Sequence, residues 1–261
     1  FTAGVMDVMM EHGIDFDGVI GVSAGAAFGC NYKSGQIGRV IRYNTRFCAD
    51  KRYGGLGVLL REGNIFSTPF CYEEVPLKHD VFDFDAYDRN PMEFYVVCTD
   101  TESGKAVYER LERSDGEALD WLRASASMPY VSRIVEIGGK NYLDGGSTDS
   151  IPVEAFQSMG YGKNVVILTR DSSYRNKPEL RGLAKLWYRK YPAFAQAQEN
   201  RYLHYNRTMD RIRELEKEGS IFVIRPSQPP TVGRMENDPQ KVRELYDLGR
   251  ADALQAVDDL T

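Results

Sequence analysis

One serine in the chain has the surroundings of an enzyme nucleophile. Ser23 lies between Gly21 and Gly25 in a Gly-x-Ser-x-Gly pattern. The apolar pair Val19-Ile20 precedes this pattern, and a run of small residues follows it. A serine in such a pattern occupies a sharp turn from a strand to a helix, where the glycines let the two elements pass closely and the hydroxyl points outward. The pattern therefore predicts a nucleophile, and a chance turn of small residues is the alternative.

A serine needs a base within hydrogen-bond reach to attack at neutral pH, and the three histidines are poorly placed for that role. His12 precedes a helix-stopping glycine and suits a helix C-cap. His79 lies in a predicted loop, where it stays open as a base. His204 falls inside a predicted helix, which fits the chain order of a hydrolase triad but not its usual loop setting.

Asp144 is the better candidate for the base. It follows a predicted strand and precedes Gly145 and Gly146, so that backbone and a neighbouring loop can approach its carboxylate closely. A carboxylate that touches a serine hydroxyl can take the proton directly, and partial desolvation makes such a group more basic. The alternative is that Asp-Gly-Gly forms an ordinary turn.

Composition narrows the class of protein. A chain of 261 residues with 42% hydrophobic and 27% charged residues fits one α/β domain with a large core. The net charge of −5 argues against a nucleic-acid backbone as the main partner, because phosphate binding needs a basic excess. The four cysteines form no C-x-x-C pair, so zinc and redox motifs are unsupported. No run of 18 apolar residues indicates a membrane-spanning helix.

Predicted helices and buried strands alternate along the chain, which implies a three-layer α/β/α fold with a mainly parallel central sheet. Ser23 and Asp144 both follow predicted strands, and active sites gather at strand carboxyl ends in such sheets. A helix opening near Pro152 is expected to take Asp149 or Ser150 as its N-cap. We expect helices at 1–11, 24–28, 35–44, 116–126 and 192–217 and from residue 238, and strands at 17–22, 91–99, 106–109, 133–137, 141–143, 164–169 and 221–225.

Two motifs together resemble the patatin-like phospholipase family, in particular its bacterial members. They are Gly21-Val22-Ser23-Ala24-Gly25 and Asp144-Gly145-Gly146, with Ala124-Ser125-Ala126-Ser127-Met128-Pro129 before the second. The likeness covers essentially the whole chain, 1–261, as one patatin-like domain. It implies a lipid acyl hydrolase with Ser23 as nucleophile and Asp144 as base, without a catalytic histidine and without a metal or organic cofactor.

A helix at 1–11 followed at once by a buried strand suggests a βαβ unit whose first strand precedes that helix. The resemblance further implies a Gly-Gly-Gly-x-Arg-Gly oxyanion loop just before the same helix. Neither is present in the sequence, so we expect both upstream of Phe1. Within the sequence, the backbone N–H of Ala24 is the oxyanion donor that can be nominated. Any signal peptide would also lie upstream of Phe1. The expected location is the cytoplasm or the periphery of a membrane.

The implied reaction is hydrolysis of a lipid ester through an acyl-enzyme, and the expected partner is a lipid or another acyl-ester substrate rather than a nucleic acid. Acyl transfer, hydrolysis of a soluble ester or thioester, and an inactive binding protein of the same fold are the alternatives. The basic and aromatic segment 181–191 suits peripheral contact with a membrane surface. Ordinary packing of Leu183, Leu186 and Trp187 into the protein is the favoured interpretation of that segment.

Overall fold

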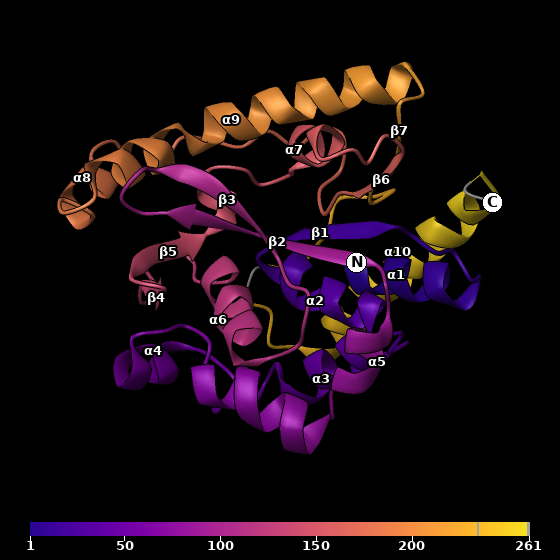
Figure 1. Cartoon of the computed structure of the whole chain (residues 1–261), viewed down its shortest axis with the longest axis horizontal. Coiled ribbons are helices and arrows are strands. Elements are labelled where there is room, and N and C mark those ends of the chain that lie inside the picture. Colours follow the sequence, from indigo (N-terminus) through magenta and orange to yellow (C-terminus); the bar gives the residue numbers. More distant parts are fainter. Residues whose placement is uncertain (234, 260–261) are drawn as a thin grey trace.

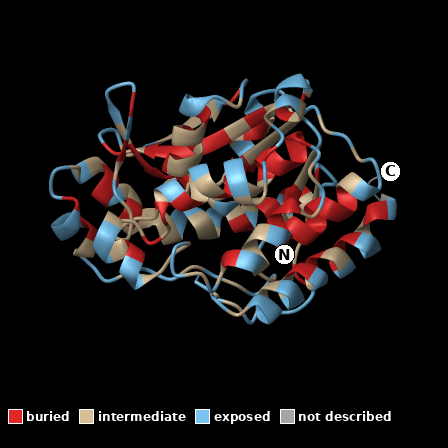
Figure 2. Cartoon of the chain, turned by 90° about the horizontal axis from the view of Figure 1, so that it is seen from below, coloured by how far each residue is buried: buried red, intermediate tan, exposed pale blue. Residues whose placement is uncertain are grey.

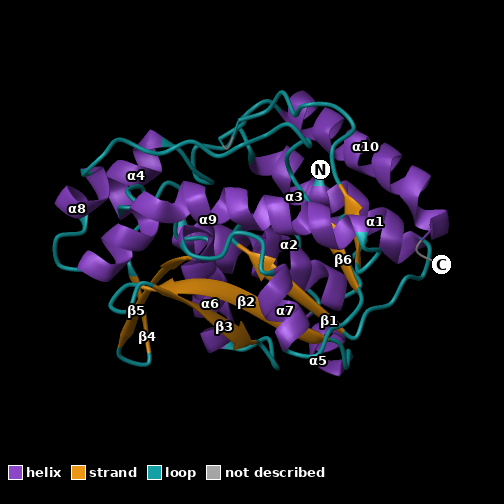
Figure 3. Cartoon of the chain, turned by 90° about the horizontal axis from the view of Figure 1, so that it is seen from above, coloured by secondary structure: helices purple, strands orange, loops and turns teal. Residues whose placement is uncertain are grey.

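The computed structural model describes residues 1–233 and 235–259 and confirms the predicted α/β class. Strands lie between two layers of helices, with the long helix α9 crossing above the sheet (Figures 1 and 3). One layer contains α7 (Val153–Ser158) and α9 (Pro192–Lys217), and the other contains α2 (Ala24–Lys33), α3 (Arg39–Phe47) and α6 (Gly116–Ser125).

The larger sheet is built around one strand, β2. Its strands are β1 (Gly18–Val22), β2 (Glu93–Asp100), β3 (Lys105–Arg110), β4 (Val135–Ile137) and β5 (Lys140–Asp144). Strand β3 runs antiparallel to β2 from residue 95 to residue 100 and takes one edge. A strand has two edges, so β1 and β5 share the other edge. The parallel strand β1 ends with Val22 beside Val97, and the antiparallel strand β5 ends with Asp144 beside Cys98.

A second, two-stranded sheet is formed by β6 (Asn164–Ile167) and β7 (Ile221–Ile224), which pair in parallel. Within residues 1–233 and 235–259, β1 pairs with β2 alone, so its other edge carries no strand. A strand upstream of Phe1 therefore stays a prediction that these pairings do not test.

The first and last long helices pack closely against each other. They are α1 (Thr2–Glu11) and α10 (Pro239–Ala256). A Cβ atom on Gly4 would lie 2.2 Å from the carbonyl oxygen of Tyr246, and one on Gly249 would lie 2.2 Å from that of Phe1. The Arg250 guanidinium donates to the Glu11 carboxylate at 2.7 and 2.8 Å beside this contact. The two helices can meet this closely only because glycine occupies both positions.

Buried residues concentrate in the strands and on the helix faces that cover them (Figure 2). No helix in the described ranges combines the length and the apolar character needed to cross a membrane. The remaining helical elements are α4 (Leu56–Glu62), the π-helix η1 (Phe70–His79), α5 (Phe84–Arg89), the 3-10 turns η2 (Gly145–Ser147) and η3 (Val257–Asp259), and α8 (Leu183–Trp187).

The predicted N-cap of the helix near Pro152 is wrong. Helix α7 has Pro152 at its N-cap position and no side-chain capping bond. The Asp149 carboxylate instead accepts a hydrogen bond from the Tyr108 hydroxyl at 2.8 Å, and the Ser150 hydroxyl donates to the carbonyl of Gly146 at 2.8 Å. Both side chains thus bind neighbouring elements rather than the helix start.

Replacing Gly249 with alanine tests the α1–α10 contact. The added methyl group would press on backbone atoms that belong to another helix, so we expect Gly249→Ala to lower the free energy of unfolding by about 1–3 kcal/mol. Urea denaturation followed by circular dichroism measures the change. Gly57→Ala is the control, because nothing lies within 4 Å of a Cβ at that helical glycine. Equal unfolding midpoints for the two variants would contradict the expectation.

Candidate active site

Ser23 occupies a strained turn between β1 and α2. Its φ of 55° and ψ of −122° lie in a region that non-glycine residues rarely adopt. Its carbonyl accepts the N–H groups of Ala26 and Ala27 at 3.0 and 3.1 Å, which begins the helix. The N–H groups of Ala24 and Gly25 precede these first helical donors, so the helix start can offer them to a ligand.

The two glycines of the serine motif have different roles. A Cβ on Gly21 would lie 2.6 Å from the backbone nitrogen and Cα of Ala26, so this glycine lets the helix pass over the strand. At Gly25 nothing lies within 4 Å of such an atom. The predicted close approach is therefore confirmed at Gly21 and wrong at Gly25. Gly25 lines the cavity beside Ser23, where a missing side chain leaves space.

A buried serine from another helix supports the turn. The Ser125 hydroxyl, at the end of α6, accepts the N–H of Ser23 at 2.9 Å and donates to the carbonyl of Val97 at 2.7 Å. Ser125 is fully buried. One hydroxyl thus joins the Ser23 turn to β2. Sequence reasoning assigned Ser125 no role, because a serine at a helix end carries no local signal of a contact 102 residues away.

Asp144 is fixed by its backbone and by its carboxylate. Its carbonyl accepts the hydroxyl of Thr99 at 2.9 Å, and its Oδ1 accepts the N–H of Gly146 at 2.7 Å. A Cβ on Gly145 would lie 2.3 Å from the carbonyl oxygen of Val97, so this glycine lets the turn run against β2. Asp144 is 6% exposed, and it is held in one orientation at the wall of a cavity.

The structure brings the two predicted residues together at the shared edge of β2. Val22 pairs with Val97, and Ser23 is the residue after Val22. Asp144 pairs with Cys98, the next residue of β2. Strand β1 has to turn away into α2 there, because the end of β5 occupies the next position along the edge. Burial, and after it the nearby Asp144 carboxylate, raises the pKa of the Cys98 thiol well above its ordinary value.

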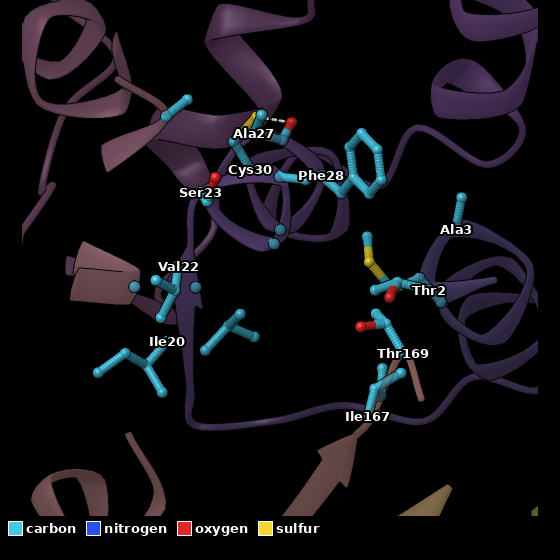
Figure 4. Close-up of a pocket in the computed structure, with 18 of the residues that line it drawn as sticks. Thr2, Ala3, Ile20, Val22, Ser23, Ala27, Phe28, Cys30, Ile167 and Thr169 are labelled. Atoms are coloured by element: carbon cyan, nitrogen blue, oxygen red, sulfur yellow. Dashed lines mark hydrogen bonds between the residues drawn. The ribbon is translucent and has the colours of Figure 1, made fainter. Parts of the chain in front are cut away.

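Ser23 and Asp144 line one cavity of about 2440 Å³. Ile20 and Val22 of β1 lie on one side of it, and Ile167 of β6 lies across from them (Figure 4). Single small-molecule sites usually enclose about 300–1,000 Å³, so this space is larger than a small polar ligand requires. Its apolar walls can receive a long hydrocarbon chain.

All three histidines lie outside this cavity. The Nδ1 atom of His12 lies 2.8 Å from the carbonyl oxygen of Val8, which confirms its predicted place at a helix end. His79 ends η1 instead of lying in a loop, and its ring packs against Phe47 and Phe70. His204 is exposed on α9. No histidine is therefore placed to serve Ser23 as a base.

Helix α9 contributes polar side chains to the cavity that sequence reasoning missed. The Arg201 Nε atom donates to the carbonyl of Gly146 at 2.6 Å. The buried Gln198 side chain donates to Glu179 at 3.2 Å, and Glu179 also accepts the hydroxyl of Tyr130 at 2.6 Å. A long helix rich in charged residues gave no signal to separate these positions from its solvated face.

A strained serine between strand and helix, with a buried aspartate beside it in an α/β fold, is the arrangement that the sequence motifs predicted. Comparison with known families agrees with it. The family model described as patatin-like phospholipase matches residues 1–156, which is more than half of the chain. The chain therefore belongs to the patatin-like phospholipase family. A second model, described as a domain of unknown function (DUF6363), matches residues 191–261.

Curated relatives extend the comparison across bacteria. The chain is 28% identical over 278 residues to the uncharacterized protein YjjU of Escherichia coli (strain K12), covering 96% of this chain and 71% of the relative. It is 25% identical over 150 residues to the uncharacterized NTE family protein Rv1063c of Mycobacterium tuberculosis. That match covers 58% of this chain and 40% of the relative.

Removing the Ser125 hydroxyl tests its support of the turn. Ser125→Ala leaves the N–H of Ser23 and the carbonyl of Val97 without this partner, so we expect a loss of about 1–3 kcal/mol in the free energy of unfolding. Chemical denaturation gives the value. Ser103→Ala, at an exposed loop serine, is the control and should change little. A Ser125→Ala protein as stable as the control would show that the hydroxyl does not support the turn.

Proposed function

We propose that the protein hydrolyses carboxylic ester bonds in lipids, with Ser23 as nucleophile and Asp144 as general base. The observation that carries the proposal is the meeting of Ser23 and Asp144 at one edge of β2, beside a cavity with apolar walls. Membership of the patatin-like phospholipase family supports the same class of substrate.

In the proposed reaction, the Ser23 oxygen attacks the acyl carbonyl while the Asp144 carboxylate takes the hydroxyl proton. The backbone N–H of Ala24, at the start of α2, donates to the oxyanion of the tetrahedral intermediate. The intermediate then collapses to an acyl-enzyme, and the leaving alcohol takes the proton from Asp144. Asp144 next removes a proton from water, which attacks the ester, and the fatty acid leaves as Ser23 recovers its proton.

Three alternatives share parts of this site. Acyl transfer to another acceptor, and hydrolysis of a soluble ester or thioester, would use the same two residues. The apolar cavity walls favour a lipid acyl group over a small soluble one. An inactive binding protein of the same fold would have no need of a serine at φ 55°. Backbone strain of this kind persists where the surrounding contacts maintain it, often at functional sites.

Labelling with a fluorophosphonate tests the nucleophile. We expect a covalent adduct on Ser23 in the wild type and none in Ser23→Ala, while Ser158→Ala, at an exposed serine, labels like the wild type. Peptide mass spectrometry locates the adduct. If Ser23 stayed unlabelled in folded wild-type protein, every version of the proposal that the protein is a serine hydrolase would be wrong.

Ester hydrolysis by matched aspartate variants tests the base. We expect Asp144→Asn to reduce kcat by at least about 10²-fold, because proton transfer by a positioned group contributes about 10²–10⁴-fold. Asp149→Asn is the control, since Asp149 lies in the same loop but is bound to Tyr108. His79→Ala and His204→Ala should stay near wild-type activity. If one histidine variant were as inactive as Ser23→Ala, that histidine rather than Asp144 would be the base.

We also propose that α8 contacts a lipid surface. The favoured expectation of ordinary packing is wrong for two of its residues, because Leu186 is 74% and Trp187 60% exposed. The Trp187 ring lies 5.8 Å from that of Tyr130, which lines the cavity. The exposed apolar residues therefore lie beside the cavity wall, where contact with a lipid surface would bring substrate close to it.

Liposome co-sedimentation tests the membrane contact. We expect the double variant Leu186→Glu with Lys190→Glu to reduce binding to vesicles that contain anionic lipid, because it removes an apolar contact and reverses a charge. Leu254→Glu changes a half-exposed leucine on α10 and serves as the control. If the double variant and the wild type bound the vesicles equally, α8 would not be part of a membrane contact.

A further inference from the structure

The turn that presents Asp144 is held by a residue from a distant part of the chain. The N–H of Gly146 donates to the Asp144 Oδ1 atom at 2.7 Å, and the carbonyl of Gly146 accepts the Arg201 Nε atom at 2.6 Å. The backbone N–H and carbonyl of Gly146 thus link the Asp144 carboxylate to the Arg201 guanidinium. Any displacement of Gly146 moves the hydrogen bond that orients Asp144.

The charge of Arg201 also lies close to the carboxylate. A Cβ atom built on Gly146 would lie 3.0 Å from the Asp144 Oδ1 atom and 4.0 Å from the Arg201 Nη2 atom. The two groups therefore face the same small volume at the cavity wall. An opposite charge at such range favours the ionised form of a carboxyl group.

Other titratable groups surround the same turn. Burial raises the pKa of the Cys98 thiol on β2 and of the Tyr72 phenol on η1, so both are uncharged at neutral pH. Three charged side chains of the described ranges also lie near this part of the cavity: Asp149 accepts from Tyr108, Glu179 accepts from Tyr130 and Gln198, and Arg123 donates to Asp120.

We infer that Arg201 is a positioning residue for the proposed base, which it orients through Gly146 and keeps ionised through its charge. The inference rests on the proposed function of Ser23 and Asp144. Arg201 lies on α9 within residues 191–261, the region that matches the domain of unknown function. This region therefore completes a site whose nucleophile and base lie in residues 1–156.

The pH profile of hydrolysis separates positioning from a merely structural role. We would measure kcat and KM of the full-length protein on a p-nitrophenyl fatty-acid ester for Arg201→Lys and Arg201→Gln. Both variants change the bond to Gly146, so we expect kcat to fall by about tenfold to 10²-fold with KM nearly unchanged. Asp144 acts when ionised, so loss of the positive charge should move the acid limb of the profile to higher pH. We expect an upward shift of about one pH unit in Arg201→Gln and no shift in Arg201→Lys.

Arg207→Gln is the matched control, because it removes the same charge from an exposed position on the same helix. It should keep the wild-type profile. An unmoved acid limb in Arg201→Gln, or a rise in KM alone, would overturn the inference while the wild type still hydrolyses the ester and labels at Ser23. A wild type that does neither would overturn the proposed function, and this inference with it.

Discussion

The site depends on the way in which two strands divide one edge of β2. Strand β3 pairs with residues 95–100 of β2 along the opposite edge, so β1 and β5 must share the edge that remains. They run in opposite directions along it and end at adjacent positions, beside Val97 and Cys98. Hydrogen-bond register alone therefore places a residue that follows β1 next to the last residue of β5. A one-residue slip in either strand would turn its side chains to the other face and separate the pair.

The same junction explains why the backbone there is unusual. Strand β1 cannot continue past Val22, and the chain turns through Ser23 with a positive φ. Three contacts offset the strain of that turn: the close passage at Gly21, the first hydrogen bonds of α2, and the Ser125 hydroxyl. The Ser125 hydroxyl donates to the carbonyl of Val97, and Gly145 packs against the same carbonyl. The turn at Ser23 and the turn after Asp144 are therefore both supported by one peptide group of β2.

Local patterns were enough to predict most elements and to select Ser23 and Asp144 as candidates that the fold brings to one strand edge. Helix α9 has the predicted bounds, and β1 and β2 lie within the predicted strands or one residue beyond them. Glycine spacing marked Ser23, and the strand followed by Asp-Gly-Gly marked Asp144, because both turns require specific residue types in sequence. The caps near Pro152 failed because the Asp149 and Ser150 side chains found partners in the tertiary structure. The roles of Ser125 and Arg201 were not predicted for the same reason, since each side chain binds a residue that is far away in the sequence.

The contacts of residues 191–261 also bear on how the two matched regions depend on each other. Helix α10 packs on α1 through Gly4 and Gly249, at a distance that only glycine permits. Helix α9 reaches the other side of the fold and binds the aspartate turn through Arg201. The first contact fixes the helix that precedes β1, and the second fixes the turn that follows β5. Because the proposed nucleophile Ser23 follows β1 and the proposed base Asp144 ends β5, both ends of the candidate site are anchored from the same part of the chain.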